Sequence, residues 1–273
     1  MATELDELIG FLTDTRAPIR KHALDIVLGL TGSPEGLSHL RSKANPVVAA
    51  LLRMVCSQDP KEATSTVSAL TNCSQDPGLV DVMLKSNCVN RLMDYLKENT
   101  CTCSPRLLVM LLSNLSVTEQ GSKEMLQLGQ GKLEGLHVAV LLKRFVVSGV
   151  NWAPDVEDPY EHVSNILVNI TRFKEGRVLL LQPGRGILQV LAAQLKAPST
   201  LRKQGAAGAI RNCCMTSEAD GTLEHVVEDL HVLECLLHPI SGQEPREKDD
   251  LPCIVVLPCL FMALLCAFMV AML

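Results

Sequence analysis

The sequence predicts an all-α protein, an armadillo/HEAT-like right-handed α-solenoid with an atypical apolar C-terminal tail. Three observations predict this fold class. A short phrase recurs at the ends of apolar helical segments, and its copies are spaced at intervals that are mostly close to 40 residues. Hydrophobic residues make up 47% of the chain and aromatic residues only 3%, so aliphatic side chains must fill the interior. Helical repeats of about 40 residues are typical of these solenoids.

The recurring phrase is an apolar residue, any residue, Asn, any residue, and then Ser, Thr or Cys. It occurs at 70–74, 112–116, 167–171 and 210–214, with a weaker copy at 27–31. The anchor residues of the five copies are Gly29, Asn72, Asn114, Asn169 and Asn212. They are separated by 43, 42, 55 and 43 residues, which predicts that they occupy equivalent places in successive repeats.

The helices of the first repeats follow from apolar spacing and from turn residues. Apolar positions 5, 8, 9 and 12 predict a helix over 5–11, and Pro18 suits the first turn of a second helix that runs to residue 30. Helices over 46–56 and 61–73 follow, separated by an Asp-Pro break at 57–60 that 74–78 nearly repeats. Further along, 182–186 is Gly-rich and predicts a turn between helices.

The third interval exceeds its neighbours by about a dozen residues. The excess falls at 148–160, which contains Trp152, Pro154 and Pro159 and predicts a loop inserted in the array. Insertions in repeat proteins often lie on the binding face. The alternative is a surface excursion whose Trp152 packs back on the array.

Charge and cysteine usage limit the class of function. The net charge is −5 and no basic stripe with interleaved aromatic residues occurs, so nucleic-acid binding is not expected. The first residues are polar and acidic, which does not fit a secretory signal peptide. Several of the 11 cysteines fall within helical patterns, where a free thiol behaves as a small apolar group. We therefore expect a reducing compartment, the cytoplasm and also the nucleus.

No pattern of catalytic residues emerges. The seven histidines form no His-Glu-x-x-His pattern, and the chain has no Cys-x-x-Cys. The closest cysteine pairs, Cys101 with Cys103 and Cys213 with Cys214, are poorly spaced for one tetrahedral metal site. The Gly-rich turn lacks the Lys-Ser/Thr of a phosphate loop. The sequence predicts no enzymatic activity, no cofactor and no metal.

The recurring Asn has two possible roles, which the sequence leaves open. An amide offers both a donor and an acceptor, so a row of them on the third helix of each repeat could hold an extended peptide. Alternatively, each amide bonds the neighbouring loop and fixes the stacking of repeats. The candidate partner-binding residues, predicted to lie on or beside the concave face, are Asn72, Asn114, Asn165, Asn169, Arg211 and Asn212.

The residues one helical turn before each Asn differ from those of peptide-binding armadillo proteins. Those proteins often place Trp there, whereas this chain has Ser68, Met110, Asn165 and Gly208. A peptide grip of the nuclear-import-receptor type is therefore not expected.

Two segments of the second half carry a more specific resemblance. They are EHVSNILVNITRFKEGR at 161–177 and RKQGAAGAIRNCC at 202–214, and the segments 4–12 and 27–32 agree with them. Over residues 1–242 the chain resembles the HGH homolog family, also called brain protein 16-like. The resemblance implies an armadillo-type cochaperone that assists the folding of translation elongation factor 2 with the cytosolic chaperonin. It therefore implies a non-enzymatic, protein-binding adaptor.

After residue 242 the sequence departs from that family. We expect a helical repeat array over 1–242, a charged linker over 243–250 and a hydrophobic tail over 251–273. As a helix the tail would span about 34 Å against about 30 Å of hydrocarbon, so its length permits a membrane anchor, although Pro252 and Pro258 interrupt it. The alternatives are a membrane-tethered interaction scaffold and a non-native end, such as an alternative exon or read-through.

Overall fold

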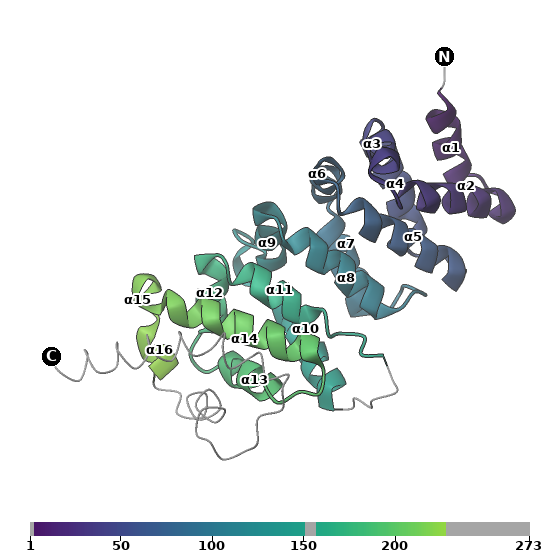
Figure 1. Cartoon of the computed structure of the whole chain (residues 1–273). Helices are drawn as coiled ribbons and strands as arrows, with labels where there is room; N and C mark the ends of the chain where they lie inside the picture. The colour runs from purple at the N-terminus through teal and green to yellow at the C-terminus, as the bar shows by residue number, and fades with distance from the viewer. Residues whose placement is uncertain (1–2, 151–156, 228–273) are drawn as a thin grey trace. The chain divides into compact units, whose positions relative to one another are not determined.

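The structure is a computed structural model of the chain, and it describes residues 3–150 and 157–227 (Figure 1). These residues form helices and turns, with no strand among them, so the predicted all-α class is confirmed for this part of the chain. They divide into two compact units, unit 1 over residues 1–127 and unit 2 over 128–273. The predicted linker at 243–250, the tail at 251–273 and Trp152 lie outside the described residues.

Unit 1 is a stack of helices. Every third helix is longer than most of its neighbours and packs on the corresponding helix of the next repeat. Figure 1 shows α2, α5 and α8 side by side, and these helices contact one another in that order. The helices are α1 (Glu4–Leu12), α2 (Ala17–Leu30), α3 (Pro34–Arg41), α4 (Ala44–Met54), α5 (Pro60–Cys73), α6 (Pro77–Lys85), α7 (Cys88–Glu98), α8 (Pro105–Ser116) and α9 (Glu119–Leu126).

Unit 2 continues the same order of helices. Its closest pair is α11 with α14, and α13 also packs on α14 (Figure 1). The elements are η1 (Gly131–Leu133), α10 (Leu136–Val150), α11 (Val163–Ile170), α12 (Lys174–Leu180), α13 (Ile187–Gln194), α14 (Thr200–Met215), α15 (Ser217–Asp220) and α16 (Leu223–Val227). None of the helices in the described residues has the length and apolarity that crossing a bilayer requires.

The five anchor residues fall at equivalent places. Each lies within the last four residues of its helix. Asn72 in α5, Asn114 in α8, Asn169 in α11 and Asn212 in α14 are on the third helix of a repeat, and Gly29 is on α2, which packs on α5 as the corresponding helix of the first repeat. The predicted repeat register is therefore confirmed.

The predicted Asp-Pro breaks are helix starts with a side-chain cap. Asp59 Oδ1 accepts a hydrogen bond from the backbone N–H of Lys61 at 2.9 Å, and Asp76 Oδ1 accepts one from Leu79 at 3.0 Å. A proline follows each aspartate at the first helical position, where its missing N–H costs nothing. These turns define where α5 and α6 begin.

Three glycines allow the sharp turn from one repeat to the next. A Cβ on Gly36, Gly121 or Gly176 would lie 2.0, 2.0 or 2.1 Å from the carbonyl oxygen six residues earlier in the chain. That oxygen belongs to the end of the preceding long helix, so the first short helix of the new repeat packs directly on backbone. The apolar spacing did not predict these short helices individually, and the recurrence of glycine at their third position is the signal that could have found them.

The predicted inserted loop is in part helical. Residues 148–150 belong to the end of α10, because the apolar pattern of this helix continues through Val146 and Val147 and Ser148 Oγ bonds back to the carbonyl oxygen of Phe145 at 3.2 Å. The prediction of a loop beginning at 148 is therefore wrong by three residues. The predicted turn at 182–186 does separate α12 from α13.

Candidate functional site

Three anchor asparagines link one repeat to the next. In each link the side-chain nitrogen Nδ2 donates a hydrogen bond to a hydroxyl that immediately follows, and caps, the third helix of the preceding repeat. The pairs are Asn72 with Thr31, Asn114 with Ser74 and Asn212 with Thr171, at 3.0, 2.8 and 3.0 Å. Each accepting hydroxyl stands two residues after an anchor, which explains why the phrase ends in Ser or Thr. The predicted role in repeat stacking is thus observed at these three positions, although the partner is a helix cap.

The accepting hydroxyls fix the orientation of the amides. Thr31 Oγ1 is buried and donates its proton to the carbonyl oxygen of Leu28 at 2.7 Å. Thr171 Oγ1 is buried likewise and donates to the carbonyl oxygen of Leu167 at 2.7 Å. A hydroxyl has one proton, so it can only accept from the amide, and the amide must present Nδ2 to it. The other amide atom, Oδ1, is then directed away from the hydroxyl and is the atom that a ligand could use.

The candidate residues of unit 2 come together on one pair of helices. Asn165 and Asn169 stand one turn apart on α11 and are half-buried, and Arg211 is exposed beside the half-buried Asn212 on α14. Because α11 and α14 pack directly on each other, these four residues share one neighbourhood. Asn72 and Asn114 are half-buried on the adjacent helices α5 and α8 of unit 1.

Small residues bring α11 and α14 unusually close. A Cβ on Gly205 would lie 2.2 Å from the Cβ of Ser164, and one on Gly208 would lie 3.0 Å from Cγ2 of Val168. Gly208 is the residue at the position where peptide-binding armadillo proteins often carry Trp. In this chain that position is used for close helix packing.

A buried ion pair, which the sequence did not predict, closes the other side of this helix pair. The Arg202 side chain is 2% exposed, and its Nε donates to Oδ2 of Asp158 at 2.5 Å. Its remaining nitrogens donate to the carbonyl oxygen of Phe145 at 2.8 Å, to Gln194 Oε1 at 2.9 Å and to Ser148 Oγ at 2.7 Å. The guanidinium also lies over the Phe145 ring, 3.9 Å from its centroid.

This pair ties together residues on both sides of 151–156. Ser148 precedes that segment and Asp158 follows it, and Arg202 on α14 bonds both. Burial is the largest single influence on the pKa of Asp158 and acts to raise it. The hydrogen bonds from Arg202 and from the Tyr160 N–H, together with the attraction of the Arg202 charge, outweigh burial, so the net pKa is lowered. The carboxylate is therefore held in its charged form. The two partners lie 44 residues apart in the sequence, so no local pattern could reveal them.

Most of the described cysteines are core residues, while Cys56 and Cys101 are half-buried. All are free thiols, and burial raises the pKa of Cys73 and of Cys88 to about 12. Burial likewise raises the pKa of Cys213, which lies in α14 next to Cys214. A thiol held in its neutral form is a poor nucleophile and a poor metal ligand. Within the described residues, no three His, Cys, Asp or Glu side chains are grouped as a metal site would require.

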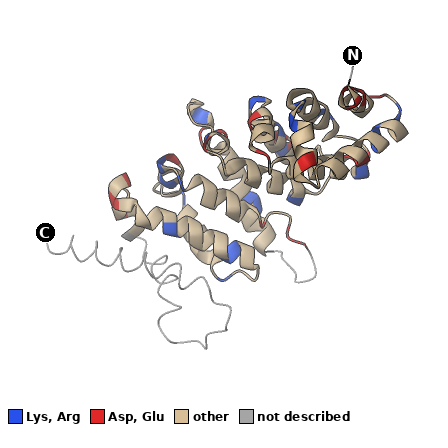
Figure 2. Cartoon of the chain, turned by 45° about the horizontal axis from the view of Figure 1, so that its top comes forward, with Lys and Arg blue, Asp and Glu red and all other residues tan. Residues whose placement is uncertain are grey.

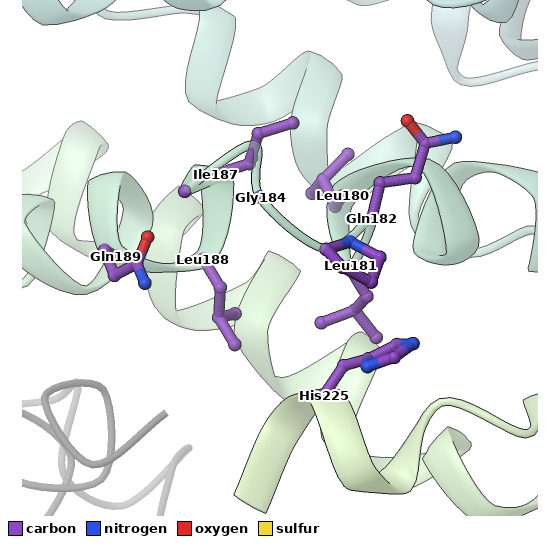
Figure 3. Close-up of a pocket in the computed structure, with 10 residues that line it drawn as sticks. Leu180, Leu181, Gln182, Gly184, Ile187, Leu188, Gln189 and His225 are labelled. Atoms are coloured by element: carbon purple, nitrogen blue, oxygen red, sulfur yellow. The ribbon is translucent and has the colours of Figure 1, made fainter. Parts of the chain in front are cut away.

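One pocket of about 390 Å³ lies between the α12–α13 turn and α16 (Figure 3). Its lining mixes leucines with polar groups, His225 is its titratable residue, and Figure 3 shows Gln182 and Gln189 toward its periphery. The lining offers no partner with which His225 could form an acid–base pair. The pocket therefore suits packing better than catalysis.

Charged residues are dispersed over each unit. Figure 2 shows basic and acidic segments interspersed along the helices. Several are used in ion pairs between neighbouring repeats, such as Arg41 with Asp76 at 3.1 Å and Arg177 with Asp220 at 2.5 Å. The described surface is that of a helical-repeat binding protein without a continuous basic stripe.

Comparison with solved structures identifies the class of this fold. A computationally designed armadillo repeat protein for modular peptide recognition superimposes with a TM-score of 0.74 and 14% sequence identity, covering 95% of this chain and 99% of that one. At this identity the likeness shows the fold alone. The predicted armadillo-type α-solenoid is confirmed.

Sequence comparison identifies the family. Residues 95–255 match the family described as "Domain of unknown function (DUF383)". The protein HGH1 homolog of Xenopus laevis is 30% identical over 257 residues, covering 90% of this chain and 67% of the relative. That of Dictyostelium discoideum is 25% identical over 253 residues, covering 91% and 68%. The chain therefore belongs to the HGH1 family, as the resemblance predicted, and spans about two thirds of these relatives. Family and fold together support a protein-interaction scaffold.

Proposed function

We propose that the protein is a non-enzymatic adaptor of the cytoplasm, a cochaperone that holds translation elongation factor 2 as a client and presents it to the cytosolic chaperonin. The observation that carries the proposal is the row of amides whose nitrogen is committed to the preceding repeat. Because Nδ2 of Asn72, Asn114 and Asn212 bonds the preceding repeat, the Oδ1 atom of each of these amides is the acceptor that a client could use. Family membership supports the identity of the client.

A repeated acceptor suits an extended segment of a protein. Backbone N–H groups of such a segment recur along its length and can meet successive Oδ1 atoms within one unit, as on Asn72 and Asn114 of unit 1. In unit 2 Asn212 carries the same link, and Asn169 is a further candidate amide on the neighbouring helix. Asn165 adds a second amide one turn before Asn169, and Arg211 adds a cation beside Asn212 that favours an acidic side chain of the client. No nucleotide is needed, because holding a segment requires binding energy alone.

The test compares two variants that break the same link from opposite ends. Asn212→Ala removes both the link and the outward Oδ1, whereas Thr171→Val removes the hydroxyl and keeps the amide. Binding of purified elongation factor 2 to the full chain is measured by biolayer interferometry, and addition of purified chaperonin tests for a ternary complex. We expect Asn212→Ala to weaken client binding several-fold and Thr171→Val to leave it nearly unchanged.

Two outcomes contradict the proposal. If the full chain does not bind elongation factor 2, the client is wrong. If both variants bind it as well as the parent protein, the asparagine row serves stacking only and the client surface lies elsewhere.

A further inference from the structure

A continuous groove runs along α10 and α13 in unit 2. Two adjoining hollows, of about 410 and 360 Å³, are both lined by Val146 of α10 and Val190 of α13, so they form one groove. The α10 side adds Ala139, Leu142 and Val147, and the α13 side adds Ile187, Ala193 and Ala197. We call this the α10/α13 groove.

Apolar groups in this groove remain accessible to water. The Val147 side chain is 54% exposed, and Val146, Ile187 and Val190 are half-buried. Ala193 is exposed as well. A contiguous apolar surface of this kind on a folded domain marks an interaction site more often than chance exposure does.

The rim of the groove is basic. Lys143, Arg185 and Lys196 border it and are all exposed, and neither Asp nor Glu occurs among its lining residues in the described part of the chain. Arg202 borders one end, but Asp158 neutralises it, so the positive field comes from the three rim residues. The chain as a whole has a net charge of −5, which makes this local excess of positive charge distinctive.

We propose that the α10/α13 groove docks an acidic amphipathic helix from a partner protein. The apolar floor accepts side chains that recur every three or four residues on one face of a helix, and the rim pairs with Asp or Glu on its flanks. At roughly 1.5 Å per residue, the 8 residues of α13 and the 15 of α10 flank about two to four turns of such a helix.

A membrane surface fits the groove less well. Binding to a bilayer requires apolar side chains that protrude into it, whereas here the apolar floor lies between two helices with the basic residues at its edges. A concave apolar floor is the arrangement that receives a helix.

This surface is independent of the asparagine row. The described helices α10 and α13 carry none of the anchor asparagines, which lie on α5, α8, α11 and α14. A scaffold with a groove on α10 and α13 and amides on α11 and α14 can hold two proteins at once. This proposal does not depend on client binding by the asparagine row, so an experiment that contradicts one of the two proposals leaves the other unaffected.

The probe is a fluorescein-labelled 18-residue peptide with Leu on one helical face and Glu on the others. Its binding to the full chain is followed by fluorescence anisotropy at low and high salt. A peptide of the same composition, scrambled so that Leu no longer forms one face, is the control ligand. We expect saturable binding of the amphipathic peptide, weakened by salt, and at least about tenfold weaker binding of the scrambled one.

Two variants test the groove directly. Ala193→Trp fills it from an exposed helical position, and the triple variant Lys143→Glu, Arg185→Glu and Lys196→Glu reverses its rim. The matched control reverses three exposed lysines of unit 1, namely Lys21, Lys61 and Lys85. Both groove variants should lose at least about tenfold in affinity, and the control, with the same change in net charge, should lose much less. Circular dichroism confirms that each variant is folded.

Several results would overturn the proposal. Equal losses in the groove and control triples would mean that binding depends on net charge alone. Unchanged affinity in Ala193→Trp would place the peptide elsewhere. If the peptide does not bind, the protein is tested for flotation with phosphatidylserine vesicles. Flotation of the parent protein that is lost in Ala193→Trp would assign the groove to membranes. Self-association lost in the same variant, measured by sedimentation, would assign it to a second copy of the chain.

Discussion

The two units are built from the same repeat but are held together differently. In unit 1 the links between repeats recur, with Asn72 bonding Thr31 and Asn114 bonding Ser74 at the same place in successive repeats. In the described part of unit 2, Asn212 makes such a link to Thr171. Unit 2 also has the buried ion pair of Arg202 with Asp158, which is not part of the repeated pattern. A repeated link is visible in the sequence, whereas a single long-range pair is not.

The ion pairs of the two units show the same contrast. In unit 1 the Arg20 side chain is 25% exposed where it meets Glu62 at 2.9 Å. In unit 2 the side chains of Arg202 and Asp158 are 2% and 1% exposed. The Glu62 side chain is itself 7% exposed, but it also accepts a hydrogen bond from the Ser57 hydroxyl, and its arginine is partly hydrated. Breaking the first pair should therefore cost less than breaking the second, in which both side chains are withdrawn from water. Substitutions in the two units therefore provide a direct test of this comparison.

The largest effect is expected from breaking the buried pair. Arg202→Met leaves the Asp158 carboxylate buried without its cation and should lower the free energy of unfolding by about 3–5 kcal/mol. Urea unfolding followed by circular dichroism measures it. Arg20→Met is the matched change in unit 1 and should cost much less. Equal losses in the two variants would contradict the contrast between the units.

Much of the fold, but little of unit 2's stabilisation, could be predicted from the sequence. The phrase spacing gave the register of the long helices because each repeat packs only on its neighbours. The buried ion pair beside α10 could not be predicted, because Arg202 and Asp158 are brought together only by the folded chain. The outward Oδ1 of Asn212 likewise depends on the direction in which the Thr171 hydroxyl donates, and sequence does not contain that information.

The turns between repeats should be the next most sensitive feature. Gly121→Ala and Gly176→Ala each place a Cβ within 2.0–2.1 Å of a carbonyl oxygen and should destabilise by about 1–3 kcal/mol. Gly29→Ala is the control, since a Cβ there has no neighbour within 4 Å and alanine favours a helix. Thermal unfolding should show lower midpoints for the first two and a slightly higher one for the control. A lower midpoint for the control as well would mean that the effect is not steric.

Acid should weaken unit 2 through Asp158. Its pKa is lowered in the folded protein, because its hydrogen bonds and the charge of Arg202 together outweigh burial, the largest single influence, which acts to raise it. The stabilisation is therefore fully present above the unfolded value of about 3.9 and is lost as the pH falls through the lowered folded pKa. The loss should be smaller than that in Arg202→Met, because a protonated carboxyl still accepts a hydrogen bond.

The measurement is the free energy of unfolding at a series of pH values between 7 and 3. In Asp158→Asn the part of the acid dependence that belongs to this residue should disappear. An unchanged profile would show that other carboxylates, such as the half-buried Asp6 and Asp14 whose pKa values are lowered to about 2, dominate the response.

The smallest effect, and the sharpest test of the repeated link, comes from the asparagines. Asn72→Ala removes the bond to Thr31 in unit 1, and Asn212→Ala removes the bond to Thr171 and a longer one, at 3.3 Å, to the carbonyl oxygen of Val168 in unit 2. Each variant should cost about 1 kcal/mol. Thr31→Val and Thr171→Val break the hydroxyl bonds from the other side. If the link is the same device in both units, the losses in the free energy of unfolding of the four variants should agree within a few tenths of a kcal/mol.

In each pair, the double variant should cost no more than its more damaging single variant, because the two groups share one bond. Full additivity of Asn212→Ala with Thr171→Val would show that the hydrogen bond contributes nothing and that the recurring Asn is kept for its outward-facing oxygen.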